Sequence, residues 1–171
     1  MPLTSAIIDY DAAWPVRYAR EAERLRPIFG ADLSAVHHVG STAIRGLAAK
    51  PEIDILIVVL TDARLGAWTN ALVPLGYRRG GDLQEGHHFF KRDAGGARTH
   101  KVHVCTRGHA QIDRMLAIRD HLRTDADDRA AYVELKRQLE RENRGGIVEY
   151  LAGKAPLLDA FYERAQAKPN R

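Results

Sequence analysis

The segment Ile53–Leu60 constrains the fold more than any other part of this 171-residue chain. Every residue in it except Asp54 is aliphatic. Successive side chains of a strand point to opposite faces, so a strand of this composition buries both of its faces. The segment is therefore predicted to be a central strand in a sheet that helices cover on both sides. Its longest apolar run, Ile55–Leu60, is too short to cross a bilayer, so we expect no membrane association.

Two carboxylates stand where this strand begins. Glu52 and Asp54 are two residues apart, and positions two apart in a strand project from the same face. Carboxylate oxygens suit Mg²⁺ and Mn²⁺, and Mg²⁺ usually shares its remaining positions with substrate phosphates. The pair predicts a divalent metal site. The alternative is an acidic strand end that forms a surface ion pair.

A glycine-serine turn precedes this strand. Ala35–Val39 is predicted to be the first core strand, and it leads into Gly40-Ser41-Thr42. Gly40 has no Cβ and lets the backbone approach a ligand closely. Ser41 or Thr42 is predicted to cap a short helix whose free N–H groups point outward and bind phosphates. We expect this turn and the Asp54 carboxylate to open into one pocket.

These patterns resemble known sequences at two levels. A Gly-Ser turn followed by a carboxylate-hydrophobic-carboxylate strand resembles the nucleotidyltransferase superfamily, to which DNA polymerase beta belongs. The longer string His38–Leu47, with Lys50-Pro51 and Ile53–Ile55, is similar to the GrpB family. The resemblance extends over nearly the whole chain, through the segments Thr99–Val104, Ile118–Arg123 and Tyr132–Lys136 and the residues Tyr150 and Lys154.

The resemblance implies a catalytic centre but leaves two points open. GrpB sequences typically have an apolar residue where Glu52 stands, so either Glu52 and Asp54 form the carboxylate pair, or Asp54 is its first member and Leu56 occupies the second place. Superfamily enzymes usually add a third acid from a neighbouring strand, and here His103 takes that place on Lys101–Cys105. Imidazole titrates near neutrality, so His103 is a candidate general base or metal ligand. The other interpretation is a structural histidine at the sheet surface.

The second half of the chain supplies basic residues. The resemblance implies that they reach over the cleft and neutralise a triphosphate. Tyr132 with Lys136, and Tyr150 with Lys154, are each four residues apart and would share a helix face. The alternative is an amphipathic surface. The candidate ligands of the nucleotide are Gly40, Ser41, Thr42, Lys50, Arg119, Lys136, Tyr150 and Lys154.

The order of the predicted elements indicates an α+β fold. A helix is predicted between Asp11, which precedes it, and Gly30, which ends it, and a second helix over Ala63–Leu75. Short strands are predicted at Tyr77–Arg79, His88–Arg92 and His100–Cys105, the last two joined as a hairpin by Asp93–Gly96. Helices follow at Ile112–Leu122, Asp125–Asn143 and Ile147–Gln166, with a break or kink at Pro156. We expect an extended start at Leu3–Asp9, and one domain with a small mixed sheet core over about 1–110, a helical lobe over about 111–167 and a frayed tail at 168–171.

Composition narrows the class of protein. The net charge of +4 is mild, and basic residues alternate with acids along the predicted C-terminal helices, so nucleic acid is not the expected partner. Cys105 is the single cysteine, which excludes an intrachain disulfide, and Met1-Pro2-Leu3 does not begin a leader sequence, so we expect a cytoplasmic protein. The histidine spacings match no common structural zinc pattern.

Three functions follow as hypotheses. The first is Mg²⁺- or Mn²⁺-dependent transfer of a nucleotidyl group from a nucleoside triphosphate to a small acceptor, with Asp54 and His103 as catalytic residues. The second is a binding protein for a nucleotide or phosphometabolite; some GrpB domains are fused to dephospho-CoA kinase, which implies a link to coenzyme A metabolism. The third is a metal-dependent phosphohydrolase that uses the histidines.

Overall fold

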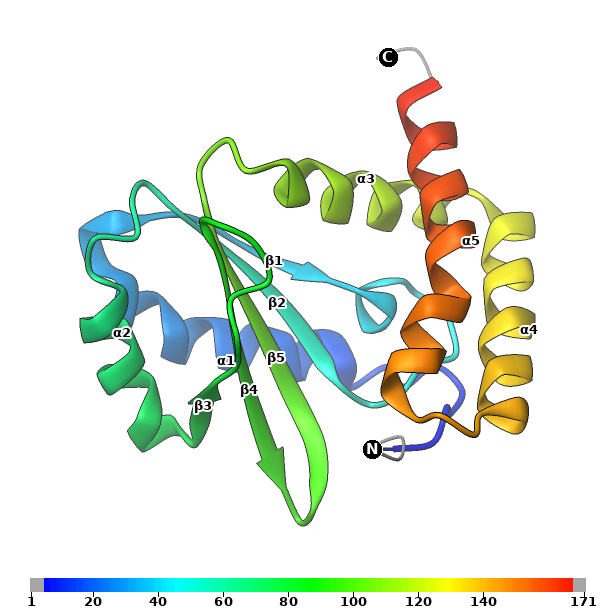
Figure 1. Ribbon diagram of the computed structural model, residues 1–171, viewed down its shortest axis with the longest axis horizontal. Coiled ribbons are helices and arrows are strands. Elements are labelled where there is room, and N and C mark those ends of the chain that lie inside the picture. The colour runs from blue at the N-terminus through cyan, green and yellow to red at the C-terminus, as the bar shows by residue number, and fades with distance from the viewer. Residues whose placement is uncertain (1–4, 168–171) are drawn as a thin grey trace.

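A five-stranded mixed sheet forms the centre of the computed structural model, which describes residues 5–167 (Figure 1). The strands lie in the order β1-β2-β5-β4-β3, and only β2 and β5 pair in parallel. Their bounds are Leu33–Val39 for β1, Ile53–Val59 for β2, Tyr77–Arg79 for β3, His87–Ala94 for β4 and Ala97–Thr106 for β5. The predicted α+β arrangement is therefore present.

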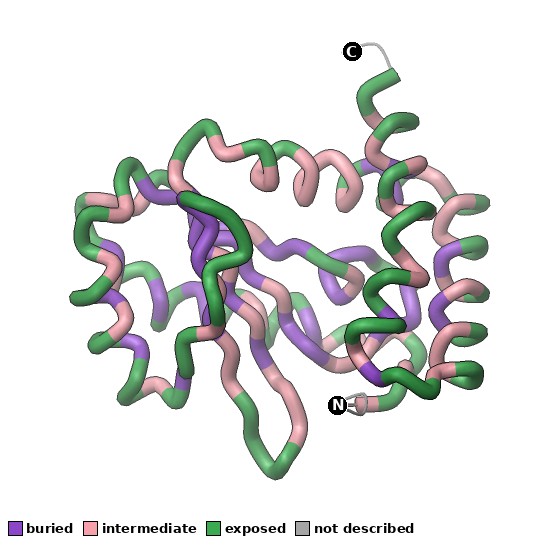
Figure 2. The backbone as a smooth tube through the Cα atoms, in the orientation of Figure 1, coloured by how far each residue is buried: buried purple, intermediate pink, exposed green. Residues whose placement is uncertain are grey.

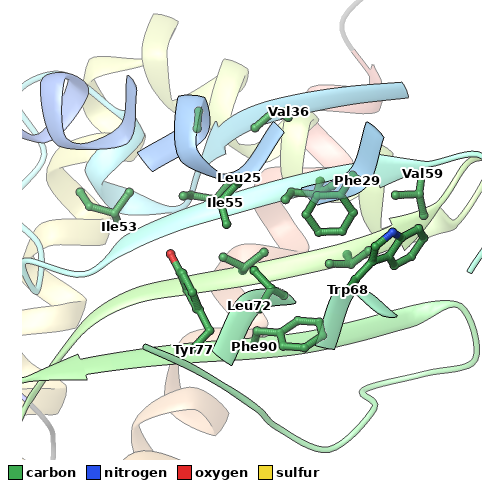
Figure 3. Packing of buried hydrophobic residues seen from close by; sticks show 14 of the residues in the cluster. Leu25, Phe29, Val36, Ile53, Ile55, Val59, Trp68, Leu72, Tyr77 and Phe90 are labelled. Carbon is green, nitrogen blue, oxygen red and sulfur yellow. The ribbon is translucent and has the colours of Figure 1, made fainter. Parts of the chain in front are cut away.

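One face of the sheet is covered by α1 (Trp14–Phe29) and α2 (Leu65–Leu72). Ile53, Ile55 and Val59 of β2 point to this side, where Phe29 of α1 and Trp68 of α2 pack on them (Figure 3). All five side chains are at most 1% exposed. This is the face that alternation along Ile53–Leu60 predicts.

The opposite face is covered by α3 (Ala110–Thr124). Leu56 and Val58 of β2 are buried there against Ile112, Met115 and Leu116 of α3. Because both faces are covered, β2 has no polar side beyond Asp54.

A helical lobe stands at the edge of the sheet next to β1 and the Ser41–Ala43 turn. It consists of α3, α4 (Ala126–Glu142) and α5 (Ile147–Ala167). Its own small core contains Leu122, Tyr132 and Phe161 together with Ile44 and Leu47 from the segment after β1. Buried residues are concentrated in the strands, whereas the outer sides of α4 and α5 are exposed (Figure 2).

Several predicted boundaries differ from the observed ones. The helix predicted over Ala63–Leu75 ends at Leu72 and continues as a 3-10 turn through Pro74, since proline lacks the N–H that an α-helical turn needs. The break predicted at Pro156 is wrong: α5 runs through it. Leu157 and Leu158, directly after this proline, are half-buried and pack against the lobe core, and tertiary packing of this kind is the main source of helix stability in proteins.

Other predicted elements are confirmed. The hairpin of β4 and β5 turns at Gly95 and Gly96, whose φ values of 59° and 79° are those of a two-residue turn. Of the extended start predicted at Leu3–Asp9, residues 3 and 4 lie outside the described residues, and Ile8 forms an isolated bridge with Ala49. The predicted tail 168–171 also lies outside them. No helix within 5–167 has the length and apolar character needed to cross a membrane.

A buried polar network connects α1 to the sheet. The Glu21 carboxylate, 3% exposed, accepts hydrogen bonds from the Tyr77 hydroxyl at 2.8 Å and from both terminal nitrogens of Arg92 at 2.7 and 3.1 Å. The Arg92 guanidinium also contacts His100 Nδ1 at 2.8 Å. These bonds satisfy groups that would otherwise destabilise the apolar layer under α1.

Candidate functional site

The end of β1 places Gly40 beside Asp54. Val39, the last residue of β1, is paired with Asp54 in the antiparallel register of β1 and β2. Gly40 follows with φ 69° and ψ −173°, a region that is essentially open to glycine alone. A Cβ at this position would lie 2.5 Å from Asp54 Oδ2. The carboxylate thus fills the space that a side chain at Gly40 would take.

Gly40→Ala is therefore expected to damage both the turn and the position of Asp54. The strained backbone alone costs about 1–3 kcal/mol, and the new methyl group would displace the carboxylate. We expect urea unfolding to show a loss of stability in this range. Gly46→Ala is a suitable control, since Gly46 also has a positive φ of 80° but a methyl group added to it would meet nothing within 4 Å. Equal losses in the two variants would contradict a specific contact with Asp54.

The turn after Gly40 differs from the prediction in its capping. Ser41–Ala43 is a three-residue 3-10 turn whose N-cap is Gly40, without a side-chain cap. The predicted cap from Ser41 or Thr42 is therefore wrong. Thr42 Oγ1 donates to the Glu52 carbonyl at 3.3 Å and accepts from His38 Nε2 at 3.1 Å. Ser41 Oγ instead accepts from Lys136 Nζ at 3.3 Å.

A pocket of about 80 Å³ collects most of the predicted site residues. Ser41 and Asp54 both line it, as the sequence predicts for a shared pocket. Four lysines and two carboxylates supply its charged lining, so positive charge is in excess. The predicted residues that it brings together are Ser41, Thr42, Lys50, Glu52, Asp54, Lys136, Tyr150 and Lys154.

Lys101 is a member of this pocket that the sequence pattern did not reveal. The parallel register of β2 and β5 pairs it with Asp54. Its ammonium lies 2.7 Å from Glu52 Oε2 and 3.6 Å from Asp54 Oδ1. The two carboxylates therefore converge on one cation, although Glu52 lies directly before β2 and is not a strand residue as the spacing predicts. The alternation along β5 predicts the face of the sheet on which Lys101 lies. Only the register between β2 and β5 shows that Lys101 is the residue paired with Asp54.

The lobe contributes two lysines whose charges are poorly compensated. Lys136 is 2% exposed, and its Nζ donates to Ser41 Oγ and to the Ala48 carbonyl. Burial, together with the charge of Lys154, lowers the pKa of Lys136 to about 7. Burial, together with the charge of Lys101, lowers the pKa of Lys154 to about 8. An anionic ligand would relieve both effects, because it supplies the missing negative charge.

Aromatic rings hold these lysines in place. The ammonium groups of Lys50 and Lys154 lie 4.2 and 4.5 Å from the centroid of the Tyr150 ring, and that of Lys136 lies 4.6 Å from the centroid of Tyr132. Both tyrosine-lysine pairs thus share a helix face, as their spacing predicts. Cations over aromatic faces are stabilised by the ring quadrupole, and the rings fix the direction in which the amines point.

Asp54 itself lies in a polar but poorly hydrated position. Its side chain is 19% exposed. Burial raises its pKa above the ordinary value even though Lys101 opposes this effect, and the nearby Glu52 carboxylate raises it further. The surrounding lysines therefore favour the ionised form of this carboxylate, and a ligand that changes the charge nearby would shift its pKa.

His103 and Arg119 line a second, adjoining cavity of about 520 Å³ between the sheet and the lobe. Gly40, Ser41, Asp54 and Lys154 border it as well, but most of its lining is apolar. His103 is opposite Leu56, two residues beyond Asp54, and its Nδ1 forms a 2.9 Å hydrogen bond with His87 Nε2.

His103 and Arg119, the two predicted site residues that line the larger cavity, already have hydrogen-bond partners. Burial, reinforced by His87, lowers the pKa of His103 to about 3, so the ring is neutral. The Arg119 guanidinium pairs with Asp120 at 2.7 and 2.9 Å and donates to the His38 carbonyl at 3.1 Å. Arg119 thus ties α3 to β1 at the wall of the cavity.

A second acidic group lies away from this pocket. Among residues 5–167, His121, Asp125 and Asp128 offer ligand atoms within 4.8 Å of one another at the junction of α3 and α4. Their contacts explain the cluster structurally, because Asp125 caps α4 and Asp128 pairs with His121 at 2.6 Å and with Arg164.

Comparison with known proteins shows which family and which relatives this sequence is similar to. The family model described as GrpB protein matches residues 4–164. A UPF0157 protein of Streptomyces coelicolor is 38% identical over 165 residues, which cover 96% of this chain and 86% of that protein. A dephospho-CoA kinase of Mycolicibacterium paratuberculosis is 30% identical over 184 residues, 93% of this chain but 45% of the kinase.

Solved structures give the same result for the fold. The conserved protein GrpB from Enterococcus faecalis superposes with a TM-score of 0.86 at 29% identity, covering 94% of this chain and 96% of that one. The Cid1 poly(U) polymerase with MgGTP bound gives a TM-score of 0.57 at 14% identity, covering 79% of this chain and 45% of the polymerase. The likeness to Cid1 concerns the fold, which resembles that of nucleotidyltransferases.

Proposed function

The chain belongs to the GrpB family, and from the pocket that its fold builds we propose that it binds a nucleoside triphosphate and transfers the nucleotidyl group to a small acceptor. One observation supports the proposal: Ser41, two lysines of the sheet part and two lysines of the helical lobe line a single pocket with the Asp54 carboxylate. Excess positive charge around a serine hydroxyl and a carboxylate suits a phosphate chain.

The phosphate ligands follow from the contacts. Lys136 and Lys154 would screen the charge that develops on the phosphates, since Lys136 is buried, Lys154 is half-buried, and burial lowers the pKa of both ammonium groups. Ser41 Oγ, already bonded to Lys136, would orient a phosphate oxygen. The adjoining apolar cavity of about 520 Å³ is large enough for the organic part of the donor or acceptor.

A nucleotidyltransferase-like fold suggests the use of a divalent metal ion. The carboxylate oxygens of Glu52 and Asp54 are the candidate ligands for such an ion. Oxygens of Glu52 and Asp54 converge on the Lys101 ammonium, so a cation fits between them. Mg²⁺ or Mn²⁺ would be held there by Asp54, with or without Glu52. When bound, such an ion polarises a phosphoryl oxygen and neutralises charge in an in-line displacement. Nδ1 of His103 is bonded to His87 Nε2, so Nε2 is the ring nitrogen that would meet an acceptor hydroxyl. It would accept a hydrogen bond from that hydroxyl in the tautomer whose proton is on Nδ1.

Lys136→Met is expected to weaken nucleotide binding. Loss of one charge-assisted hydrogen bond raises Kd about tenfold to a hundredfold. Each protein is melted with and without ATP or GTP in Mg²⁺, and the shift is taken relative to its own nucleotide-free melting temperature. For the unaltered chain, ligand at 100 times Kd adds about 2.7 kcal/mol, or roughly 5–10 °C. Arg20→Met, on the exposed side of α1, is the control for lost charge. A shift unaffected by Lys136→Met would contradict the phosphate assignment.

A second candidate function is favoured by Lys101. A lysine opposite Asp54 supplies positive charge where catalysis would need a further acidic ligand, and this suits a protein that binds a phosphometabolite without transferring it. The similarity to dephospho-CoA kinases makes CoA-related phosphates the ligands to test. Binding of these compounds without pyrophosphate release from any nucleoside triphosphate would favour this function over nucleotidyl transfer.

A further inference from the structure

Lys101 occupies the point where the two carboxylates of the pocket meet. Its ammonium contacts Glu52 Oε2 at 2.7 Å and Asp54 Oδ1 at 3.6 Å. The Glu52 side chain is 4% exposed and that of Asp54 19%, so neither carboxylate is well hydrated. Two neighbouring carboxylates in such a place repel each other and require a cation.

Of the two remaining oxygens of the pair, one accepts a hydrogen bond and the other lies close to the backbone. Ser5 Oγ donates to Glu52 Oε1 at 2.9 Å, and Asp54 Oδ2 lies against the backbone of Gly40, where even a methyl group would not fit. A dissolved ion that approaches the pair therefore has to compete with the ammonium of Lys101. The competition favours lysine, because β5 holds it beside Asp54 by the strand pairing itself.

Lys101 nevertheless has room to leave the carboxylates. Its side chain is 29% exposed and borders both the small pocket and the larger cavity. An arriving triphosphate offers the ammonium a stronger partner than two carboxylates that already repel each other. The same arrival brings phosphate oxygens that complete the coordination of a divalent ion.

From this geometry we infer that Lys101 is a resident cation that determines the cation specificity of the site. While it bridges Glu52 and Asp54, the protein without nucleotide binds divalent ions poorly. A divalent ion gains access when a phosphate ligand draws the ammonium away. Lys101 is thus a specificity-determining residue, and the inference rests on the proposed function in assigning Glu52 and Asp54 as cation ligands.

Mn²⁺ binding by the nucleotide-free protein tests the inference. Free Mn²⁺ is measured by its electron paramagnetic resonance signal as each protein is titrated. Lys101→Met is expected to bind Mn²⁺ at least about tenfold more tightly than the unaltered chain, because one positive charge about 4 Å away is removed. The double variant Lys101→Met/Asp54→Asn is expected to lose this gain, which separates the site from the His121 cluster on α3 and α4.

Two further variants keep the result interpretable. Lys101→Gln retains a polar side chain without the charge, and it replaces Lys101→Met if thermal melting shows that variant to be unfolded. Arg20→Met removes a distant charge and is expected to leave Mn²⁺ affinity unchanged. Equal Mn²⁺ affinity in the unaltered chain and in both Lys101 variants would overturn the inference. Because no nucleotide is present, this failure is distinct from a failure to bind nucleoside triphosphates.

Discussion

Asp54→Asn is expected to lower the rate of pyrophosphate release in nucleotidyl transfer about 10²–10³-fold. This is the size of effect seen when one preorganised electrostatic group is removed from a catalytic centre. Asparagine has nearly the same shape, so the contact with Gly40 is kept, but the amide lacks the negative charge that holds Lys101 and would hold a divalent ion. The measurement is pyrophosphate release from each nucleoside triphosphate with Mg²⁺ and a mixture of small acceptors.

The control for this prediction is Asp9→Asn, whose carboxylate is 90% exposed and pairs with Arg137 on the surface. It is expected to retain the full rate. Nucleotide binding by Asp54→Asn is measured in parallel by thermal shift, and the lysines are expected to preserve most of it. Undiminished turnover in Asp54→Asn would exclude the catalytic hypothesis while leaving the binding function open.

The central strand was predictable because its composition permits one arrangement. An aliphatic run interrupted only by Asp54 has to be covered on both faces, and α1, α2 and α3 provide the cover. The shared pocket of Ser41 and Asp54 was likewise predictable, since a glycine turn that ends one strand lies beside the first residues of its antiparallel partner.

The cation at the carboxylates was not predictable from periodicity. Alternation along β5 places Lys101 and His103 on one face but does not say which of them stands opposite Asp54. That depends on the register with β2, which is set by packing across the whole sheet. The resemblance to nucleotidyltransferases suggested His103 in the place of a third acid, and the register puts Lys101 opposite Asp54 and His103 opposite Leu56, beside His87. The role of Lys101 is a proposal that the Lys101 variants test.

The sheet core and the helical lobe meet at the pocket, and this contact bears on the domain organisation. Asp54 and Lys101 come from the sheet and Ser41 from the turn after β1, whereas Lys136 and Lys154 come from α4 and α5. We propose that the chain acts as a single domain, as its length suggests, because neither part holds the complete set of ligands. Ile44 and Leu47, buried in the lobe core, connect the two.

Glu21→Gln is expected to destabilise the protein by about 3–5 kcal/mol, measured by urea unfolding at pH 7. The Arg92 side chain is 16% exposed, and removal of its carboxylate partner leaves a buried, uncompensated charge. Glu23→Gln, two residues away on the exposed side of α1, is the matched control and is expected to change stability by less than about 0.5 kcal/mol. The double variant Glu21→Leu/Arg92→Met is expected to recover much of the loss, because neither charge then remains.

The same pair predicts how stability depends on pH. Burial raises the pKa of Glu21, but the hydrogen bond from Tyr77 and the charge of Arg92 together lower it by more, so its pKa lies below the ordinary 4.5. A lowered carboxyl pKa contributes stability above the unfolded-state value, and this contribution is lost as pH falls through the folded-state value. The stability difference between the unaltered chain and Glu21→Gln should therefore be constant above about pH 5.5 and narrow below pH 4.5. A difference that stayed constant down to about pH 3 would show that the ionised carboxylate is not what stabilises α1 on the sheet.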